Sequence, residues 1–476
     1  MGWCAMRLWI LGLIVTWVGL VAADASAGEP VRCRLAVFHS DVTPPLGHRL
    51  LTGLRKPAEA VDEPLQARGF ALLPEGQPAI VVVSVDWAEI RNAAYDRWRT
   101  GLAEAAGTTR ERVLLSCIHQ HDTPLGDLTA QLLITAAGSS GQVIDPVFHE
   151  ACVQRAADSL KSAISQAVPI THYGQGLGKI SELASNRRYL RPDGTPTYGR
   201  YSGGGSVESR AAEEGIVDPY LRALSFWDGD KPVAVLNVYA THPMSYYGTG
   251  RVSIDFPGMA RERRQGDDVS IFQIYASGAS GNITVGKYNS GAHELRPVFA
   301  DRLLQGMRAA FAATTRHPIH NVEFRSVPLQ LPLRNSGHLQ KSELEAAVQN
   351  QDDPRRQELA ALGLSWAQRV EAQQPIDVPA IDFGGAVLVL LPGEMYIEYQ
   401  LLAQKLKPDQ FVVVLGYGEC GPGYVPIERA WEEGDENLGD WCWVERGSEA
   451  RVVEALQKVL KAPQPLGIKD VLAPEK

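Results

Sequence analysis

The sequence is poor in cysteine and lacks the spacings and runs that several protein classes require. Six cysteines in 476 residues include no C-x-x-C pair, which argues against a zinc site built from thiolates. Beyond the N-terminus no apolar run reaches the ~20 residues of a membrane-spanning helix. A net charge of -9 and the lack of nucleic-acid-binding motifs argue against a nucleic-acid partner. We therefore expect a soluble mature chain that does not bind nucleic acid.

Two hydrolase signatures are also missing. The G-x-S-x-G turn that presents the nucleophile of serine lipases and esterases does not occur. The H-x-H-x-D-H pattern of metallo-β-lactamases is not met, because Asp122 directly follows His121 and no histidine comes next. These absences disfavour a serine nucleophile and that class of metal site.

The N-terminus has the pattern of a secretory signal peptide. Arg7 precedes an apolar run over 8–23, and Ala25-Ser26-Ala27 supplies the small-x-small pattern that signal peptidase accepts. The run is shorter than the ~20 residues that an uncleaved membrane anchor needs. The sequence therefore predicts a signal over residues 1–27 and an exported chain, either secreted or periplasmic.

Cleavage would remove Cys4 and leave an odd number of cysteines, so at least one thiol is free or pairs between chains. In an oxidising compartment, Cys420 and Cys442 are candidates for a disulfide that closes the loop between them.

Apolar runs alternate with helical patterns along the mature chain. Such alternation predicts an α/β fold in which a mixed β-sheet core is covered by helices. The expected strands are 67–73, 79–85, 113–118, 232–239, 270–276, 386–391 and 411–415. The expected helices are 95–106, one from 257, 294–314, 339–374 with a break at 352–354, 395–407 and 448–462. No repeat or linker is evident, so residues 28–476 are predicted to form a single domain.

Polar residues that can bind a metal follow three of the apolar strands. His119 and His121 come just after one strand, and their i, i+2 spacing points both imidazoles the same way along an extended backbone. His242 and Glu394 each follow another strand, and the carboxyl ends of strands in an α/β sheet meet where ligands bind. Two imidazoles and a carboxylate form an open ligand set for catalytic zinc. Alternatively, the histidines are hydrogen-bonded structural residues and Glu394 favours a helix N-terminus.

Five motifs in this order resemble the catalytic domain of the neutral (alkaline, non-lysosomal) ceramidases. The resemblance runs from Asp41 to the region around Tyr424. The motifs are Cys117-Ile118-His119-Gln120-His121-Asp122-Thr123-Pro124, Tyr239-Ala240-Thr241-His242-Pro243, Gly281-Asn282-Ile283-Thr284, Leu391-Pro392-Gly393-Glu394 and Gly423-Tyr424-Val425. The resemblance implies hydrolysis of the amide bond of ceramide to a fatty acid and a sphingoid base, with one zinc ion that activates water.

The resemblance also implies roles for particular residues. The implied zinc ligands are His119, His242, Glu394 and Tyr424. The implied catalytic residues are His121 and Arg187, which flank the scissile group, and Thr284, which supplies a hydroxyl. A salt bridge within its loop is an equally good explanation of Arg187.

Three departures from the family pattern keep other substrates open. The family's Gly-Asp-x-Ser is Gly-Asn-x-Thr at 281–284, the residues after His121 are Asp122-Thr123 in place of Ser-Gly, and no C-terminal immunoglobulin-like domain is expected. The alternatives are a zinc hydrolase acting on a non-lipid amide or ester, and an exported zinc-binding homologue without catalysis. The expected partner is a small amphipathic or acyl-amide substrate, with membrane contact peripheral at most. No feature predicts an oligomeric state, or whether the loop over 187–213 closes over substrate.

Overall fold

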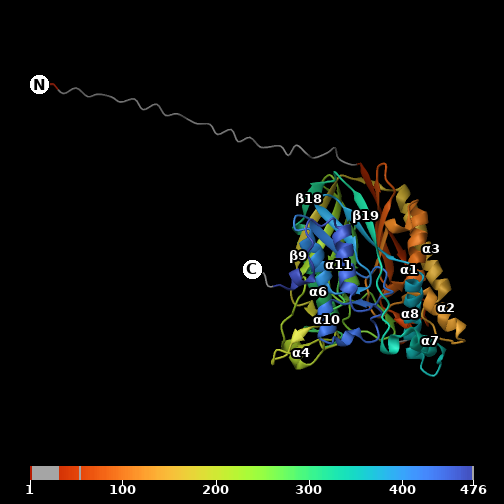
Figure 1. The fold of residues 1–476 in the computed structure, drawn as a ribbon. Helices are drawn as coiled ribbons and strands as arrows, with labels where there is room; N and C mark the ends of the chain where they lie inside the picture. Colours follow the sequence, from red (N-terminus) through yellow and green to blue (C-terminus); the bar gives the residue numbers. More distant parts are fainter. Residues whose placement is uncertain (3–31, 53–54, 474–476) are drawn as a thin grey trace.

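The structure is a computed structural model that describes residues 1–2, 32–52 and 55–473 (Figure 1). The predicted signal over residues 1–27 therefore lies outside the described residues, except for its first two. Within the described ranges, no helix combines the length and apolar character needed to cross a bilayer.

Three larger sheets form the centre of the molecule. The first has the order β6 (Val113–Cys117), β4 (Ile80–Val85), β3 (Gln66–Pro74), β1 (Cys33–Asp41) and β8 (Val168–Ile170). The second has the order β16 (Phe272–Ser277), β14 (Lys231–Tyr239), β13 (Tyr220–Asp228), β9 (His172–Lys179) and β18 (Thr315–Pro318). The third has the order β19 (Glu323–Leu329), β20 (Ile376–Asp382), β21 (Ala386–Leu390) and β23 (Phe411–Leu415). The predicted mixed α/β class is confirmed, with three sheets in the core.

Each sheet has one parallel pair at an edge, while its other strands pair antiparallel. The parallel pairs are β4 with β6, β14 with β16 and β21 with β23. Parallel neighbours need a long crossover connection, which is usually helical. The crossovers here contain α1 (Asn92–Ala106), α5 (Asp255–Asp267) and α9 (Ile397–Leu406). Both strands of each pair therefore end at the same edge of their sheet.

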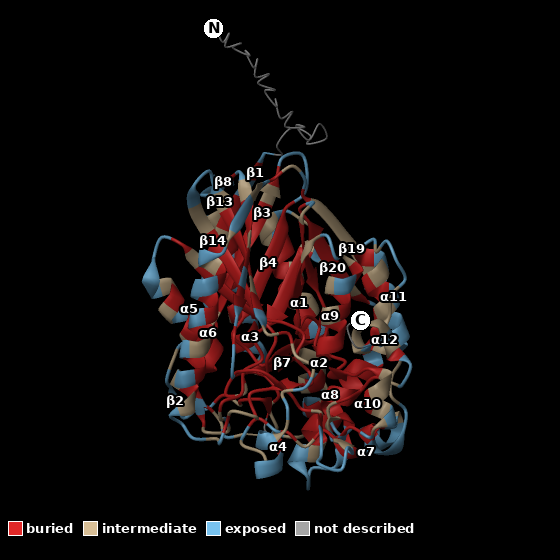
Figure 2. Ribbon diagram, turned by 90° about the vertical axis from the view of Figure 1, so that its left-hand side faces the viewer, coloured by how far each residue is buried: buried red, intermediate tan, exposed pale blue. Residues whose placement is uncertain are grey.

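The parallel strands are apolar because both of their faces are covered. All residues of β4, β6 and β21 are buried. One apolar cluster contains members of all three sheets, including Val82, Leu114, Leu236, Ile274, Leu388 and Val413. In Figure 2 the buried strands lie at the centre, and the surrounding helices carry the exposed positions. The three sheets therefore meet in one apolar cluster.

Hydrogen bonds join the ends of β6, β16 and β23. The N–H of Cys117 donates to the carbonyl of Tyr417 at 2.9 Å, and the N–H of Gly416 donates to the carbonyl of Ser277 at 2.9 Å. The Ser277 hydroxyl donates to the carbonyl of Ile118 at 2.8 Å. The three loops that follow these strands are thereby fixed relative to one another.

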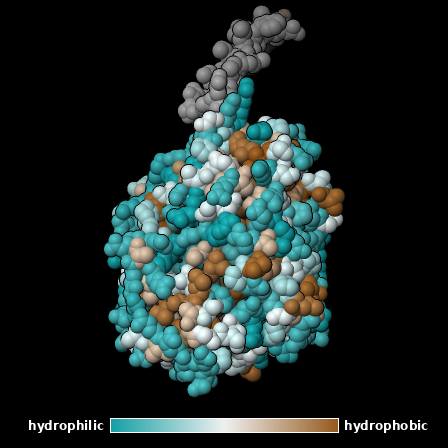
Figure 3. All heavy atoms as spheres, turned by 90° about the vertical axis from the view of Figure 1, so that its right-hand side faces the viewer, coloured by the Kyte–Doolittle hydropathy of each residue, from teal (hydrophilic) through white to brown (hydrophobic). Residues whose placement is uncertain are grey.

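Helices form the outer layer. Helix α3 (Pro146–Ser165) packs with α1 beside the first sheet, α6 (Leu295–Ala312) packs with α5 beside the second, and α11 (Ser448–Val459) packs on the third. The other helices are α2 (Leu128–Ala136), α4 (Val207–Ala211), α7 (Lys341–Gln349), α8 (Pro354–Glu371), α10 (Glu428–Glu432) and α12 (Ile468–Leu472). The face drawn in Figure 3 is mostly hydrophilic, with hydrophobic residues in small groups.

The candidate disulfide between Cys420 and Cys442 is not formed. All five cysteines among the described residues are free and buried. The thiol of Cys420 points to the carbonyl of Gly418 at 3.2 Å, and that of Cys442 points to the carbonyl of Val444 at 3.8 Å. Burial raises the pKa of Cys442 to about 12, so this thiol stays protonated at neutral pH.

A buried ion pair attaches α5 to the first sheet. Arg261 donates to both carboxylate oxygens of Asp86, at 2.6 and 2.9 Å, and both side chains are buried. We expect Arg261→Met to lower the free energy of unfolding by about 3–5 kcal/mol, because it leaves a buried carboxylate without its partner. The shift in the urea midpoint measures this effect. Arg308→Met removes a more exposed pair with Asp267 and should cost at most about 1 kcal/mol; equal shifts would contradict the expectation.

Candidate metal and active site

His119 is held in an unusual backbone conformation just after β6. Its φ is +77°, in the left-handed region that residues other than glycine rarely adopt. Its N–H donates to the carbonyl of Trp87 at 3.0 Å, and its ring stacks on Tyr417 with centroids 4.4 Å apart. Nδ1 lies 2.8 Å from the carbonyl oxygen of Ala88. Because a carbonyl only accepts, Nδ1 carries the proton and Nε2 presents its lone pair.

His242 is oriented in the same way from the second sheet. It lies just beyond β14, and its Nδ1 donates to the carbonyl of Ser280 at 2.7 Å. Burial, with a contribution from the positive charge of Arg187, lowers the pKa of His242 to about 4. The imidazole is therefore neutral at pH 7, with Nε2 available as a ligand.

Glu394 completes the group from the third sheet. Its Oε2 lies 3.2 Å from His119 Nε2 and 3.0 Å from His242 Nε2. All three atoms are buried and have no hydrogen-bond partner within the part of the chain that the structure describes. Three facing lone pairs repel one another unless a positive charge, either a proton or a metal ion, lies between them. His119, His242 and Glu394, with ligand atoms within 4.8 Å of one another, therefore fit a metal ion.

The charge balance of this group also favours a cation. Burial alone would raise the pKa of Glu394, but the neighbouring His119 and His242 hold it well below its usual range. Burial alone would lower the pKa of His119, yet the carboxylate of Glu394 raises it above 6.5. The site thus keeps its carboxylate ionised and attracts positive charge.

Tyr424, the fourth predicted ligand, lies directly beside Glu394. The short strands β22 (Glu394–Met395) and β24 (Tyr424–Val425) pair in parallel, with Glu394 opposite Tyr424. The Tyr424 ring centroid is 6.4 Å from that of His242, and its hydroxyl accepts a hydrogen bond from Arg187 Nη1 at 2.8 Å. Arg187 also donates to Asn437 Oδ1 at 2.8 Å. The arginine therefore makes no loop salt bridge and faces the site.

Two glycines allow the chain to approach Glu394 closely. A Cβ on Gly281 would lie 2.1 Å from the carbonyl oxygen of Glu394, and one on Gly423 would lie 2.0 Å from that of Trp441. Gly423 also has a φ of +65°. The carbonyl of Gly423 accepts a hydrogen bond from the N–H of Glu394 at 2.9 Å. The N–H of Gly281 donates to the carbonyl of Met395 at 2.8 Å. These contacts fix the backbone at Glu394 and so position its carboxylate.

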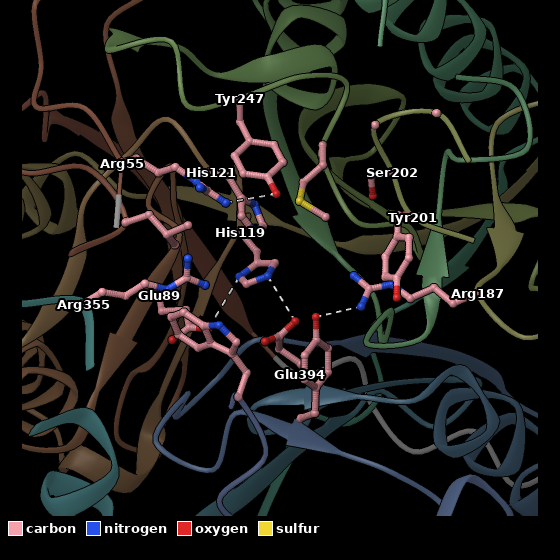
Figure 4. Close-up of a pocket in the computed structure, with 16 residues that line it drawn as sticks. Arg55, Glu89, His119, His121, Arg187, Tyr201, Ser202, Tyr247, Arg355 and Glu394 are labelled. Carbon is pink, nitrogen blue, oxygen red and sulfur yellow. Dashed lines mark hydrogen bonds and ion pairs between the residues drawn. The ribbon is translucent and has the colours of Figure 1, made fainter. Parts of the chain in front are cut away.

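The predicted metal group opens into a pocket with a volume of about 460 Å³ (Figure 4). This volume lies within the range of sites for small ligands. His119, Glu394 and Tyr424 line it together with His121 and Arg187. Its other lining residues are Leu51, Arg55, Glu89, Tyr201, Ser202, Gly203, Gly204, Met244, Tyr247, Arg355 and Trp441.

His121 faces the pocket beside the metal group. Its ring centroid is 4.8 Å from that of His119 and 5.0 Å from that of Tyr247. Nδ1 has no hydrogen-bond partner among residues 1–2, 32–52 and 55–473. Burial of His121 is the main cause that lowers its pKa well below 6.5, and the two neighbouring histidines, His119 and His242, lower it further. The neutral imidazole can take up a proton and release it again.

Thr284 does not line the pocket. It lies on β17 (Ile283–Thr284), which pairs with β10 (Ser185–Asn186), and it is fully buried. Its hydroxyl bonds to the hydroxyl of Ser202 at 2.6 Å, and Ser202 is the residue that lines the pocket. The structure therefore brings six of the seven predicted site residues around one cavity or its metal group and places Thr284 behind Ser202.

The polar loop over 184–213 forms one wall of the pocket. It contains β10, β11 (Tyr189–Leu190), β12 (Pro196–Thr197) and α4, and contributes Tyr201 to Gly204 to the lining. The buried guanidinium of Arg200 donates to the carbonyls of Asn186, Ser209, Ala212, Glu213 and Glu214. One arginine thus orders a segment that has no sequence periodicity.

Sequence reasoning missed several residues of the pocket. Glu89, on β5 (Glu89–Arg91), has Oε1 3.9 Å from His119 Nδ1, and burial raises its pKa to about 7. Glu89 lies just past the buried strand β4, and Tyr417 lies just past β23. They fit the same pattern as the metal ligands, a polar residue that follows an apolar strand, and this pattern could have identified them. Arg55 and Arg355 come from a loop and from the first turn of α8, and no local pattern marks them.

Three sheets whose parallel strands end at a buried His-His-Glu group define this chain as a mixed α/β protein of the neutral ceramidase-like fold. The structure is similar to that of neutral ceramidase from Pseudomonas aeruginosa, with a TM-score of 0.65 and 16% identity, over 92% of this chain and 76% of that chain. A ceramidase complexed with C2 gives a TM-score of 0.65 and 15% identity, over 94% and 76%. Neither models of protein families nor curated proteins give a match by sequence. The fold predicted by the resemblance is confirmed.

Proposed function

We propose that this protein is an exported, zinc-dependent amidohydrolase that cleaves an N-acyl amide bond, with ceramide as the substrate suggested by the fold. One observation carries the proposal. Three buried acceptor atoms of His119, His242 and Glu394 face one another without a donor beside a pocket, in a fold shared with ceramidases. Export rests on the predicted signal over residues 1–27, and residues 28–476 are proposed to act as one catalytic domain.

The proposed ion is zinc, held by His119, His242 and Glu394 with Tyr424 beside them. Two neutral imidazoles and one carboxylate are a ligand set of catalytic zinc. When bound, zinc supplies a Lewis acid and makes water reactive near pH 7. The carbonyls of Ala88 and Ser280 fix the two histidine tautomers, as carbonyls behind metal ligands commonly do.

The remaining residues of the pocket would handle protons and the carbonyl oxygen. His121 can take a proton at Nδ1 and pass it to the departing amine. Arg187, with its guanidinium against the Tyr424 hydroxyl, is placed to stabilise negative charge on the oxygen. Thr284 would act through Ser202, which its hydroxyl orients.

Removal and return of the metal tests this proposal. We expect purified mature protein to release fatty acid from a fluorescent short-chain ceramide, to lose this activity after dialysis against a chelator, and to regain it with zinc. Activity that persists after complete metal removal would refute the metal-dependent mechanism. A zinc-loaded protein that hydrolyses no acyl amide or ester would favour the binding-protein alternative.

A non-lipid amide or ester is the second candidate substrate. The pocket favours it because Arg55, Arg187 and Arg355 all line a cavity of about 460 Å³. Polar walls offer little burial to a long acyl chain.

Tyr424→Phe is expected to weaken zinc retention while leaving the fold intact. The change removes the hydroxyl beside Glu394 and leaves Arg187 Nη1 with Asn437 as its remaining partner. Loss of a group that supports a metal site typically costs about 10–100-fold in affinity. Metal content after timed dialysis against a chelator measures the effect. Tyr198→Phe, which removes a hydroxyl bonded to Glu433, is the control; equal retention in wild type and Tyr424→Phe would exclude Tyr424 as a ligand.

A further inference from the structure

Besides Arg187, two arginines in the pocket wall have no carboxylate partner among the described residues. Arg55 makes one hydrogen bond from Nη2, to the Tyr247 hydroxyl at 3.3 Å, and its Nε is buried without a partner. Its guanidinium lies over the Tyr247 ring, 4.8 Å from the centroid. Arg355 is exposed on the first turn of α8 and also lines the pocket. Both point into the cavity in Figure 4.

The acidic residues of the pocket do not neutralise this pair. Glu394 faces the two histidines of the metal group. Glu89 is paired with Arg91, with 3.4 Å between Arg91 Nη1 and Glu89 Oε2. The wall that carries Arg55 and Arg355 is therefore positive, and a guanidinium recognises carboxylates and phosphates through paired hydrogen bonds.

The positions of Arg55 and Arg355 indicate that they contact the leaving-group side of the substrate. His121, the proposed proton donor to the leaving amine, has its ring 5.0 Å from Tyr247, and Tyr247 carries Arg55 on its ring. Arg187, which donates a hydrogen bond to the Tyr424 hydroxyl, lies on the other side of His119 (Figure 4). The leaving group thus lies toward Arg55 and Arg355, and the carbonyl oxygen lies toward Arg187.

We propose that the substrate carries an anionic group on its amine portion, as an N-acyl amino acid does, and that Arg55 and Arg355 bind this group. The inference rests on the proposed function of the same site. The reaction adds one water across the amide: the C–N bond breaks, the hydroxyl goes to the acyl carbon to give a carboxylic acid, and a proton goes to nitrogen to give the free amino acid.

Two substrates that differ in charge alone test the inference. N-Octanoylglycine and N-octanoylglycinamide share chain length and shape, but only the first is an anion. We expect zinc-loaded wild type to hydrolyse octanoylglycine with at least about tenfold higher kcat/KM, which is the usual scale of a charge-assisted hydrogen bond. The double variant Arg55→Gln, Arg355→Gln should bring this ratio close to one, mainly through a higher KM for the anion. The double variant with lysine should keep part of the preference, because it keeps the charge.

A control is Arg34→Gln, which removes one positive charge from an exposed residue outside this pocket and should leave the ratio unchanged. Equal kcat/KM for the two substrates, an unchanged ratio in the double variant, or faster hydrolysis of a short-chain ceramide than of octanoylglycine would overturn the inference. If neither probe nor the short-chain ceramide is hydrolysed, the proposed function fails and calorimetric binding of the two probes decides. Tighter binding of the anion that the double variant loses supports the anion site, and equal binding refutes it.

Discussion

Glu394→Gln is expected to abolish zinc binding and amide hydrolysis in a chain that still folds. Oε2 of Glu394 lies 3.0 and 3.2 Å from the two imidazole Nε2 atoms, so this carboxylate is the negative centre of the group. An amide of the same shape removes the charge that offsets the positive charge of the metal ion. Loss of outer residues around a metal typically costs about 10–100-fold in affinity, and loss of a ligand should exceed that. The protein should remain folded because a neutral amide is less costly to bury than a carboxylate.

Zinc per chain and kcat on an N-acyl amide are the two readouts for this variant. Glu398→Gln is the matched control, since Glu398 is a buried acid four residues further on that bonds to Asn282 at 2.9 Å and Arg429 at 3.2 Å and does not line the pocket. We expect this control to keep one zinc per chain. A Glu394→Gln protein with full zinc content and wild-type kcat would show that the His-His-Glu group is not the metal site.

The positions of the three metal-group residues were predictable because a strong local signal marks each of them. Val113 to Ile118, Pro232 to Tyr239 and Ala386 to Leu391 are apolar runs that read as buried strands, and the structure has strands at all three. A polar residue just beyond such a run lies at a sheet edge, which placed His119, His242 and Glu394. Likewise, the break predicted at 352–354 separates α7 from α8, where Asp353 caps the second helix.

Strand β9 shows why other parts of the fold were missed. Its segment His-Tyr-Gly-Gln-Gly-Leu-Gly-Lys, 172–179, has three glycines and little strand propensity. The glycines are required by α6: a Cβ on Gly176 would lie 2.1 Å from the carbonyl oxygen of Ala310, and one on Gly178 would lie 2.1 Å from that of Gly306. The strand therefore depends on a helix about 130 residues further along the chain. The residues near β9 in the sequence contain no signal for such a contact.

The charged wall of the pocket was unpredictable for the same reason. Arg55 precedes the first helix and Arg355 begins α8, and only the packing of distant elements brings them to one cavity with His121. The resemblance to the ceramidases predicted the metal ligands but did not predict which charged residues line the pocket. Substrate preference is consequently the property for which the structure adds most to the sequence.

His121→Ala is expected to keep zinc and lose about 10²–10⁴-fold in kcat on an amide. His121 lies outside the His119–His242–Glu394 group, so its loss leaves the three proposed ligands in place. Burial lowers the pKa of His121 and keeps the imidazole neutral at pH 7, and its unpartnered Nδ1 faces the pocket, where it can accept a proton and deliver it to the departing nitrogen. An amine leaves only after it gains that proton, whereas p-nitrophenolate leaves without one.

This difference separates a catalytic role from a structural one. Loss of proton transfer should reduce hydrolysis of an N-acyl amide far more than hydrolysis of the matching p-nitrophenyl ester, while a distorted pocket would reduce both alike. His149→Ala is the control, because His149 is a buried histidine beside Trp87 and Trp98 that does not line the pocket. Equal losses on amide and ester in His121→Ala would remove His121 from proton transfer, and wild-type kcat on the amide would remove it from the mechanism altogether. An amide-specific loss at full zinc occupancy would place the leaving amine beside His121, on the side of the cavity that Tyr247 and Arg55 line.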